Sequence, residues 1–483
     1  MSIQNVPLES QDLTDEELAK LVIKNYGYKL KYCTEWKSWI LYEGRIWKKV
    51  DTPVTYQFVW AIGDSIKAAI WEKSKNTKTG SNVDASQALN QKLKAVVKLG
   101  NVRPTENIMR AAQGMNPVSI TEFDADPYIL NCQNGVLDLK TMQLKPHDPS
   151  QLLTKMTSAA YIGKYHSSLW LDTVASIFPN EETRNYVQKV LGYTLCGGNK
   201  EELAFFLFGT GGNGKGVIMG TVIQTLGDYA VVIPSDTLIT AGNYGEDGSG
   251  VSPHIAALRG ARLASASETN NGRTLNASVL KQLTDQGKVL YARGIRQDPI
   301  QFIATHVLFL ESNYPPAIID VRDNGLTRRI MIIPFKQTFS AEQGNRNNDL
   351  KELLATQEAK EDVLTWLVEG YRKYTQEGLK PPMEVIEANR EYYDDNDIVG
   401  HFLEVHCEMG PDKSILKGDL YKAFKDNYIN EGGSFPMSSK SFSQILQKIP
   451  GIKSGKTQKG RIWKGIGRKD TPIPLPPLHE MDR

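Results

Sequence analysis

The stretch FFLFGTGGNGKG, residues 205–216, decides the fold class of this chain. Its apolar beginning predicts a buried strand, and the spacing G-x-x-x-x-G-K from Gly209 to Lys215 is that of a phosphate-binding loop. Glycines let backbone N–H groups curl round phosphate oxygens without Cβ clashes. The apolar spacing of residues 217–226 predicts a following helix, whose amino end would face the phosphates. The alternative is a glycine-rich strand-to-helix turn without a ligand.

Within this loop we expect Lys215 to reach the β- and γ-phosphates of a nucleotide. Position 216 is glycine, where the usual motif has a Ser or Thr hydroxyl that helps to hold Mg²⁺. The residues expected to contact the nucleotide are Gly209, Thr210, Gly211, Gly212, Asn213, Gly214, Lys215, Gly216 and Val217.

The bulk properties are those of an ordinary globular protein. The 483 residues are enough for two or three domains. The net charge of +2 is close to neutral, so binding to nucleic acid would depend on local basic regions. The four cysteines lie far apart, without the C-x-x-C spacing of a zinc site. No apolar run reaches membrane-spanning length and the amino terminus is polar and acidic, so we expect a cytoplasmic protein without a membrane partner.

Ahead of the phosphate loop, the pattern alternates between helices and short strands. Residues 16–26 and 55–115 have helical periodicity, and residues 32–50 have the pattern of a hairpin rich in Trp and Tyr. These aromatic side chains favour a small core under a sheet over a platform for stacked bases. Asn134-Gly135 between two apolar runs predicts a tight turn, and residues 165–197 return to helix.

Beyond the loop, polar side chains follow two predicted strands. Residues 262–266 predict a short buried strand with Glu268 just past its end, and the segment 305–313 predicts another with Asn313 at its exit. At the carboxyl edge of a parallel sheet, a carboxylate can hold Mg²⁺ and polarise water, and an amide can orient the attacking water. The alternatives are a surface carboxylate and a turn asparagine.

Two short apolar-alternating runs, residues 289–293 and 300–303, flank a turn that contains Gly, Asp and Pro and predict a β-hairpin. Lys288, Arg293 and Arg296 lie on or near this turn. The pattern alone leaves open whether the hairpin contacts nucleic acid or is a solvated basic turn.

The adjacent Arg328 and Arg329 precede a predicted apolar strand, residues 331–335. In a ring of ATPases, an arginine in this place can reach across the subunit interface and stabilise charge on the transferred phosphate. An ordinary surface pair is the alternative.

The carboxyl-terminal part is helical and charged over residues 341–400 and basic after that. From Pro411 to Asp470 there are 13 Lys and Arg against 5 Asp and Glu, a local excess of +8. This excess favours a phosphate-backbone partner, although a packing domain with an incidental charge excess would have the same composition. The proline-rich residues 472–477 predict a disordered tail.

Taken in order, seven motifs resemble those of the superfamily-three helicases, in the primase-helicase branch of phages, plasmids and poxviruses. They are NGVLDL (134–139), PHDP (146–149), GTGGNGKG (209–216), RLASASET (262–269), LKQLTDQGKVLYAR (280–293), LFLESNYPP (308–316) and TRRIMIIPF (327–335). The resemblance covers residues 125–340 well and the flanks more loosely.

The resemblance implies an AAA+-like ATPase that uses ATP and Mg²⁺ and forms a hexameric ring round one DNA strand. Lys215 would bind phosphate, Glu268 would hold the metal and activate water, and Asn313 would sense the γ-phosphate. Arg328 or Arg329 would act in trans on the nucleotide of a neighbouring subunit. The residues implied at DNA are Lys281, Lys288, Arg293 and Arg296 around the hairpin, and Lys440, Lys459 and Arg461 in a C-terminal winged helix.

We therefore expect an α/β P-loop core with smaller domains on either side. The expected units are an N-terminal α+β domain (1–120), a helical collar (121–198), the AAA+-like core (199–340), a helical connector (341–405), a winged-helix domain (406–470) and a disordered tail (471–483). The first 120 or so residues show no paired-carboxylate signature of a primase, so we expect a helicase without primase activity.

The expected function is an ATP-dependent replicative DNA helicase of a phage, plasmid or mobile element. It would act in the host cytoplasm on single-stranded and forked DNA, with a separate primase or polymerase as a partner. The alternative is an origin-binding or loader ATPase whose ATP cycle controls assembly without unwinding. A degenerate ATPase with a structural or defence role is a third hypothesis.

Overall fold

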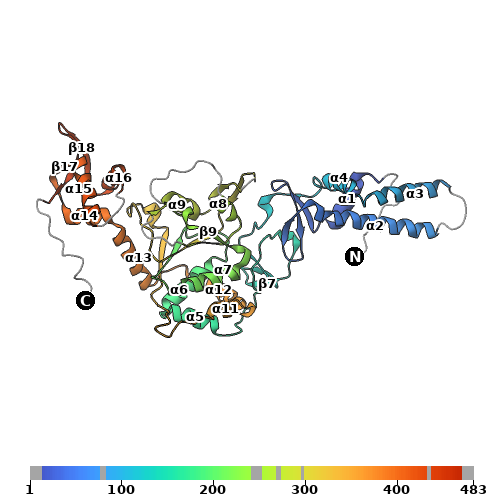
Figure 1. The fold of residues 1–483 in the computed structure, drawn as a ribbon, viewed down its shortest axis with the longest axis horizontal. Helices are drawn as coiled ribbons and strands as arrows, with labels where there is room; N and C mark the ends of the chain where they lie inside the picture. The colour runs from blue at the N-terminus through green and yellow to red at the C-terminus, as the bar shows by residue number, and fades with distance from the viewer. Residues whose placement is uncertain are drawn as a thin grey trace.

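The computed structural model describes residues 13–76, 83–240, 253–267, 274–294, 298–431 and 437–469. Figure 1 shows an elongated chain with N-terminal helices at one end, a mixed α/β body in the middle and a small C-terminal unit at the other end. Helix α13 (Met383–Asn396) leads from the central body to the C-terminal unit. Within the described ranges, no helix combines the length and the apolar character needed to cross a bilayer.

One parallel sheet of five strands forms the centre of the body, in the order β16-β8-β15-β11-β9. Strands buried on both faces are apolar along their whole length, which is why these runs could be recognised in the sequence. The sheet confirms the α/β prediction, and the strand bounds differ from those expected by one or two residues. The strands are β8 (Ala204–Phe208), β9 (Ala230–Pro234), β11 (Leu263–Ser267), β15 (Val307–Ser312) and β16 (Ile330–Pro334).

Helices cover both faces of this sheet. On one face, α6 (Glu181–Tyr193), α7 (Lys215–Leu226) and α12 (Gln357–Glu377) share a core with β8 and β15. On the other face, α9 (Ala277–Thr284) and α13 pack against the remaining side chains of the same strands. The carboxyl edge of the sheet is therefore held between two apolar layers.

The contact between α6 and α12 depends on two glycines. A Cβ at Gly192 would lie 2.3 Å from the Tyr371 backbone nitrogen, and a Cβ at Gly370 would lie 2.1 Å from the Gln188 carbonyl oxygen. Both distances are far below van der Waals contact, so only glycine allows the two helix backbones to approach this closely.

Shorter elements surround the sheet. The pair β13–β14 is antiparallel, which confirms the predicted hairpin, and the pair β5–β6 confirms the turn at Asn134-Gly135. In chain order the shorter elements are β5 (Ile129–Cys132), β6 (Gly135–Asp138), β7 (Gln143–Lys145), α5 (Leu169–Ile177), β10 (Ile239–Thr240), α8 (Pro253–Ala257), β12 (Thr274–Leu275), β13 (Val289–Ala292), β14 (Ile300–Ile303), α10 (Asn324–Thr327) and α11 (Leu350–Leu354).

The N-terminal region combines a helical bundle with a small sheet of order β3-β2-β1-β4. Trp39 and Trp47 are buried, and the Trp36 ring stacks on Phe123 at 5.4 Å between centroids, as expected for a small aromatic core. The elements are α1 (Asp15–Tyr26), β1 (Leu30–Cys33), β2 (Ser38–Tyr42), β3 (Trp47–Val50), α2 (Thr52–Asn76), α3 (Val83–Lys98), α4 (Val102–Ala112) and β4 (Pro117–Val118).

The C-terminal unit packs three helices against a three-stranded antiparallel sheet of order β17-β19-β18. Its core includes Phe424, Phe442 and Trp463, so the unit has its own apolar centre. Strand β17 was not predicted from the sequence. The elements are α14 (Ile398–His406), β17 (Cys407–Leu416), α15 (Lys417–Asn430), α16 (Ser439–Lys448), β18 (Lys453–Thr457) and β19 (Gly460–Arg468).

Candidate functional site

The glycine-rich loop lies between the carboxyl end of β8 and the amino end of α7, as its sequence predicts. Gly211, Gly212 and Gly214 have φ angles of +105°, +59° and +88°, a region that side chains disfavour. At Gly214 a Cβ would also lie 2.6 Å from the Ile177 side chain. The glycines are therefore needed for the path of the loop, which presents its backbone at the amino end of a helix.

Lys215, the first residue of α7, is buried beside this loop. Its Nζ atom donates hydrogen bonds to the Gly209 carbonyl at 2.6 Å, to Asn213 Oδ1 at 3.1 Å and to Asn313 Oδ1 at 3.0 Å. Burial lowers the pKa of Lys215, and the nearby Glu311 carboxylate opposes that shift. The ammonium group thus has three neutral oxygen acceptors, which phosphate oxygens could replace.

The carboxyl end of β15 supplies the other polar groups at this edge. Asn313 follows the strand, as predicted, and reaches Lys215 across 98 positions of sequence. Glu311 lies inside the strand and accepts a hydrogen bond from the Ser265 hydroxyl at 3.2 Å. Burial raises the pKa of Glu311, against the lowering effects of Ser265 and Lys215. Sequence analysis missed Glu311, although a carboxylate within an otherwise apolar run was visible.

A cavity of about 1050 Å³ opens over the loop, large enough for a nucleotide. It is lined by residues of α5, by the end of β15 and by a segment far along the chain, residues 345–348 and 350–351. The backbone N–H of Phe339 donates to the Gly212 carbonyl at 2.7 Å and brings that far segment back to the loop. Arg346 and Lys351 on this segment are two exposed cations in the cavity wall that the sequence did not reveal.

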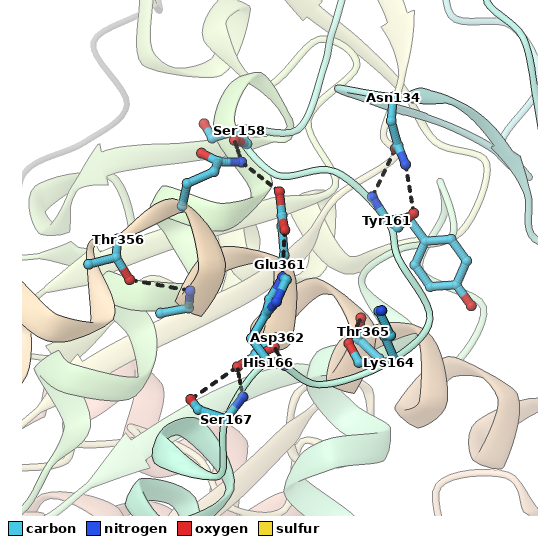
Figure 2. A network of polar contacts seen from close by, with 12 residues as sticks. Asn134, Ser158, Tyr161, Lys164, His166, Ser167, Thr356, Glu361, Asp362 and Thr365 are labelled. Atoms are coloured by element: carbon cyan, nitrogen blue, oxygen red, sulfur yellow. Dashed lines mark hydrogen bonds and ion pairs between the residues drawn. The ribbon is translucent and has the colours of Figure 1, made fainter.

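The loop that precedes α5 is hydrogen-bonded to α12 (Figure 2). The buried Asp362 carboxylate accepts the backbone N–H groups of His166 at 2.6 Å and Ser167 at 3.2 Å. The His166 ring lies 2.8 Å from Glu361, also on α12. At the other end of the loop, Asn134 bonds both the N–H and the carbonyl of Tyr161. These contacts position α5 beside the cavity.

The two adjacent arginines have different environments. Arg329 is buried and contacts Glu202 at 3.0 Å and Asp285 at 3.3 Å. The Arg328 side chain is 57% exposed and contacts Glu202 at 2.6 Å. Burial favours a higher pKa for Glu202, but the hydrogen bond from Arg328 and the charges of both arginines outweigh it and lower that pKa. Arg329 is thus tied into its own subunit, while Arg328 is accessible to another molecule.

The hairpin residues are only partly brought together. Lys288 is exposed just before β13, 3.9 Å from Asp285, and Arg293 is exposed just after this strand. Lys281 lies in α9 and not in the hairpin strands, and it contacts Asp323 at 2.5 Å. Two predicted site residues, Glu268 and Arg296, lie outside the described residues, so the structure says nothing about them. Within the described ranges, no group of three or more His, Cys, Asp or Glu side chains is placed to hold a metal ion by itself.

The three basic residues predicted in the C-terminal unit are all exposed. Lys440 lies in the first turn of α16, Lys459 lies between β18 and β19, and Arg461 lies in β19. Lys417 lies over the Trp463 ring, 3.7 Å from its centroid. The unit therefore presents cations on a helix start and on the neighbouring strand turn.

Comparison with known proteins gives one family match and several viral relatives. Residues 19–179 match the family described as D5 N terminal like. A protein of Acanthamoeba polyphaga mimivirus, named as a candidate helicase, is 24% identical over 480 residues, or 93% of this chain and 49% of the relative. A candidate helicase of frog virus 3 is 28% identical over 68% of this chain and 33% of the relative.

A candidate primase of African swine fever virus is 29% identical over 50% of this chain and 25% of that protein. The chain thus spans about half the length of the mimivirus relative and less of the others. Among solved structures, the apo C-terminal region of NrS-1 aligns with a TM-score of 0.47 and 11% identity, over 94% of this chain and 100% of that one. The family match and the viral relatives support the resemblance of this chain to the primase-helicase-type superfamily-three helicases.

Proposed function

We propose that this chain is an ATP-dependent replicative DNA helicase that moves on single-stranded DNA as a hexameric ring. The observation that carries the proposal is the convergence of Lys215 and Asn313 in one nucleotide-sized cavity, at the amino end of α7. A parallel sheet with this loop at its carboxyl edge supports an AAA+-like P-loop core over residues 199–340.

In the proposed cycle, ATP phosphates take the place of the neutral oxygens around Lys215. Asn313 then contacts the γ-phosphate or the attacking water, and Glu268 holds Mg²⁺ and polarises that water. Mg²⁺ neutralises charge on the phosphates when it is bound. Arg328 is the better of the two candidates for the trans-acting arginine, because Arg329 is buried against carboxylates of its own subunit.

The proposed DNA contacts lie on the hairpin and on the C-terminal unit. The exposed Lys288 and Arg293 flank β13, and a winged-helix role for residues 406–470 is supported by the exposed cations on α16 and β19. Such contacts bind the phosphate backbone without reading sequence, as a translocating enzyme requires. The proposed site of action is the host cytoplasm, with a primase or polymerase as partner.

Strand displacement on a forked duplex tests the proposal. We expect the purified chain, with ATP and Mg²⁺, to release the displaced strand, and Lys215→Ala to abolish the release. DNA binding and ATP hydrolysis without displacement would favour the alternative, an origin-binding or loader ATPase. Biological activity that survives Lys215→Ala would instead point to a degenerate ATPase.

A further inference from the structure

The carboxylate of Glu311 stands at an unusual place, at the end of an otherwise apolar strand. It interrupts β15, whose preceding residues are buried and apolar, and it faces the side of the sheet that carries α7. Among the described residues, it accepts a single side-chain hydrogen bond, from the Ser265 hydroxyl on the neighbouring strand β11. A half-buried carboxylate held by one hydroxyl costs stability unless it meets a cation.

The position of Glu311 is that of a ligand-binding group. It lines the same cavity as the phosphate loop and Asn313, and its charge acts on Lys215. The Lys215 ammonium, however, is already satisfied by three neutral oxygens and makes no hydrogen bond to Glu311. Neutralising the charge of Lys215 therefore does not explain the position of Glu311, since charge balance alone does not require the Glu311 carboxylate to face the cavity.

The lack of a side-chain hydroxyl at position 216 explains the position of Glu311 better. Mg²⁺ in nucleotide sites is held by one or two carboxylates, by phosphate oxygens and by water, so a single protein carboxylate in this cavity fits its chemistry. The usual loop adds a Ser or Thr oxygen, which Gly216 cannot provide.

We propose that Glu311 is a metal-binding carboxylate of the nucleotide site and supplies the Mg²⁺ contact that Gly216 cannot make. This inference rests on the proposed ATPase function. It adds to the site a residue that lies in the strand itself, in addition to the carboxylate expected from Glu268.

The test measures how Mg²⁺ promotes nucleotide binding, independently of turnover. Full-length protein is titrated with Mg²⁺ in the presence of fluorescent N-methylanthraniloyl-ATP, and Mn²⁺ binding is followed in parallel by electron paramagnetic resonance. For Glu311→Gln we expect the Mg²⁺ midpoint to rise about tenfold or more, with equal or tighter nucleotide binding in EDTA. An unchanged midpoint would overturn the assignment.

A second substitution separates a metal ligand from a general negative field. Asp172 on α5 is another carboxylate in the cavity wall and accepts a hydrogen bond from Ser168 at 2.6 Å. We expect Asp172→Asn to move the Mg²⁺ midpoint far less than Glu311→Gln. Equal shifts in the two variants would mean that both act only through their charge, and the specific role of Glu311 would be lost.

Restoring the hydroxyl provides the sharpest check. A Cβ at Gly216 would meet no atom within 4 Å, so serine fits there without rearrangement. We expect Gly216→Ser to recover most of the Mg²⁺ affinity lost in Glu311→Gln, and failure of this rescue counts against the proposal. If the unsubstituted protein binds no ATP with or without Mg²⁺, the proposed function itself fails. If it binds ATP and only the Glu311→Gln shift is absent, only this inference fails.

Discussion

The edge of the central sheet and the C-terminal unit both carry cations, but they hold them in opposite ways. At the sheet edge, Lys215 is buried and bonded to three oxygens, and the neighbouring Glu311 has a pKa raised by burial. In the C-terminal unit, Lys440, Lys459 and Arg461 are exposed to solvent.

This contrast separates two kinds of electrostatics. Buried charges interact strongly at short range, are screened little by salt and respond to pH through shifted pKa values. Exposed charges attract phosphates collectively. Each of them contributes little binding free energy, and salt screens them. Single substitutions should therefore abolish function at the sheet edge and only weaken it in the C-terminal unit.

The largest effect is expected for Lys215→Ala. The substitution removes the ammonium that is hydrogen-bonded to the loop oxygens, so ATP hydrolysis should fall to background. Hydrolysis is followed as released phosphate, with thermal unfolding as the check on folding. The matched control is Lys380→Ala, which removes an exposed lysine and should leave both measurements unchanged. Substantial hydrolysis by Lys215→Ala would show that the cavity is not the catalytic site.

The two adjacent arginines should separate into a functional and a structural residue. Arg328→Ala should reduce hydrolysis roughly 1000-fold, the usual contribution of a trans-acting arginine, with little change in melting temperature. Arg329→Ala should instead lower the melting temperature by roughly 5 °C, because it leaves Glu202 and Asp285 without their buried partner.

Mixing experiments provide the control for this pair. Subunits with Lys215→Ala keep Arg328, and subunits with Arg328→Ala keep an intact loop, so a mixture should regain part of the activity at their shared interface. No recovery, together with normal hydrolysis by Arg328→Ala alone, would exclude Arg328 as the trans-acting residue.

A third prediction concerns pH. His306 lies at the amino end of β15, buried, and burial lowers its pKa to about 4. Its ordinary value is about 6.5, so the folded state favours the neutral ring. The contribution of this pKa shift to the free energy of unfolding is fully present above pH ~6.5 and is lost as the pH falls towards 4. The total loss amounts to about 3 kcal/mol.

The substitution His306→Leu should remove this dependence. The melting temperature of the unsubstituted protein should fall more steeply between pH 7 and pH 4 than that of the variant, whatever the difference at neutral pH. The exposed His401 provides a matched control, since His401→Leu should keep the steep slope. Parallel slopes in all three proteins would show that His306 is not the group that titrates.

The sequence predicts the sheet edge well because its signals are local. Apolar runs give the strands, the glycine spacing gives the loop, and the rule that parallel strands end at one edge brings Asn313 to Lys215. The relation to known families also extends further towards the amino terminus than the motifs indicated, since the family match begins at residue 19.

The residues missed by sequence analysis depend on long-range folding. Arg346 and Lys351 reach the cavity only because the chain turns back after β16 and bonds to the loop at Gly212. Lys281 matched a DNA-contacting motif, yet its partner Asp323 lies 42 positions away and no local pattern predicts that pair. Glu311 was missed for a local reason, because a carboxylate inside an apolar strand looks like an interruption of the strand and not like a functional residue.

The smallest effect per residue is expected in the C-terminal unit, where salt is the sensitive variable. If Lys440, Lys459 and Arg461 each neutralise one phosphate, replacing all three by Ala should reduce the slope of log affinity against log salt by about 2 for single-stranded DNA. Each single substitution should change the slope by less than 1. Fluorescence anisotropy with labelled oligonucleotides, at several salt concentrations, measures this slope.

The matched control comes from the sheet edge. Lys215→Ala should leave the salt slope unchanged when no nucleotide is present, because its ammonium is buried among protein oxygens and releases no counterions from DNA. If the triple variant keeps the full slope, the excess charge of the C-terminal unit does not face DNA, and the phosphate contacts must lie elsewhere, with Lys288 and Arg293 as the next residues to replace. A reduced slope in Lys215→Ala would instead merge the two regions into one DNA-binding surface and remove the distinction between buried and exposed cations.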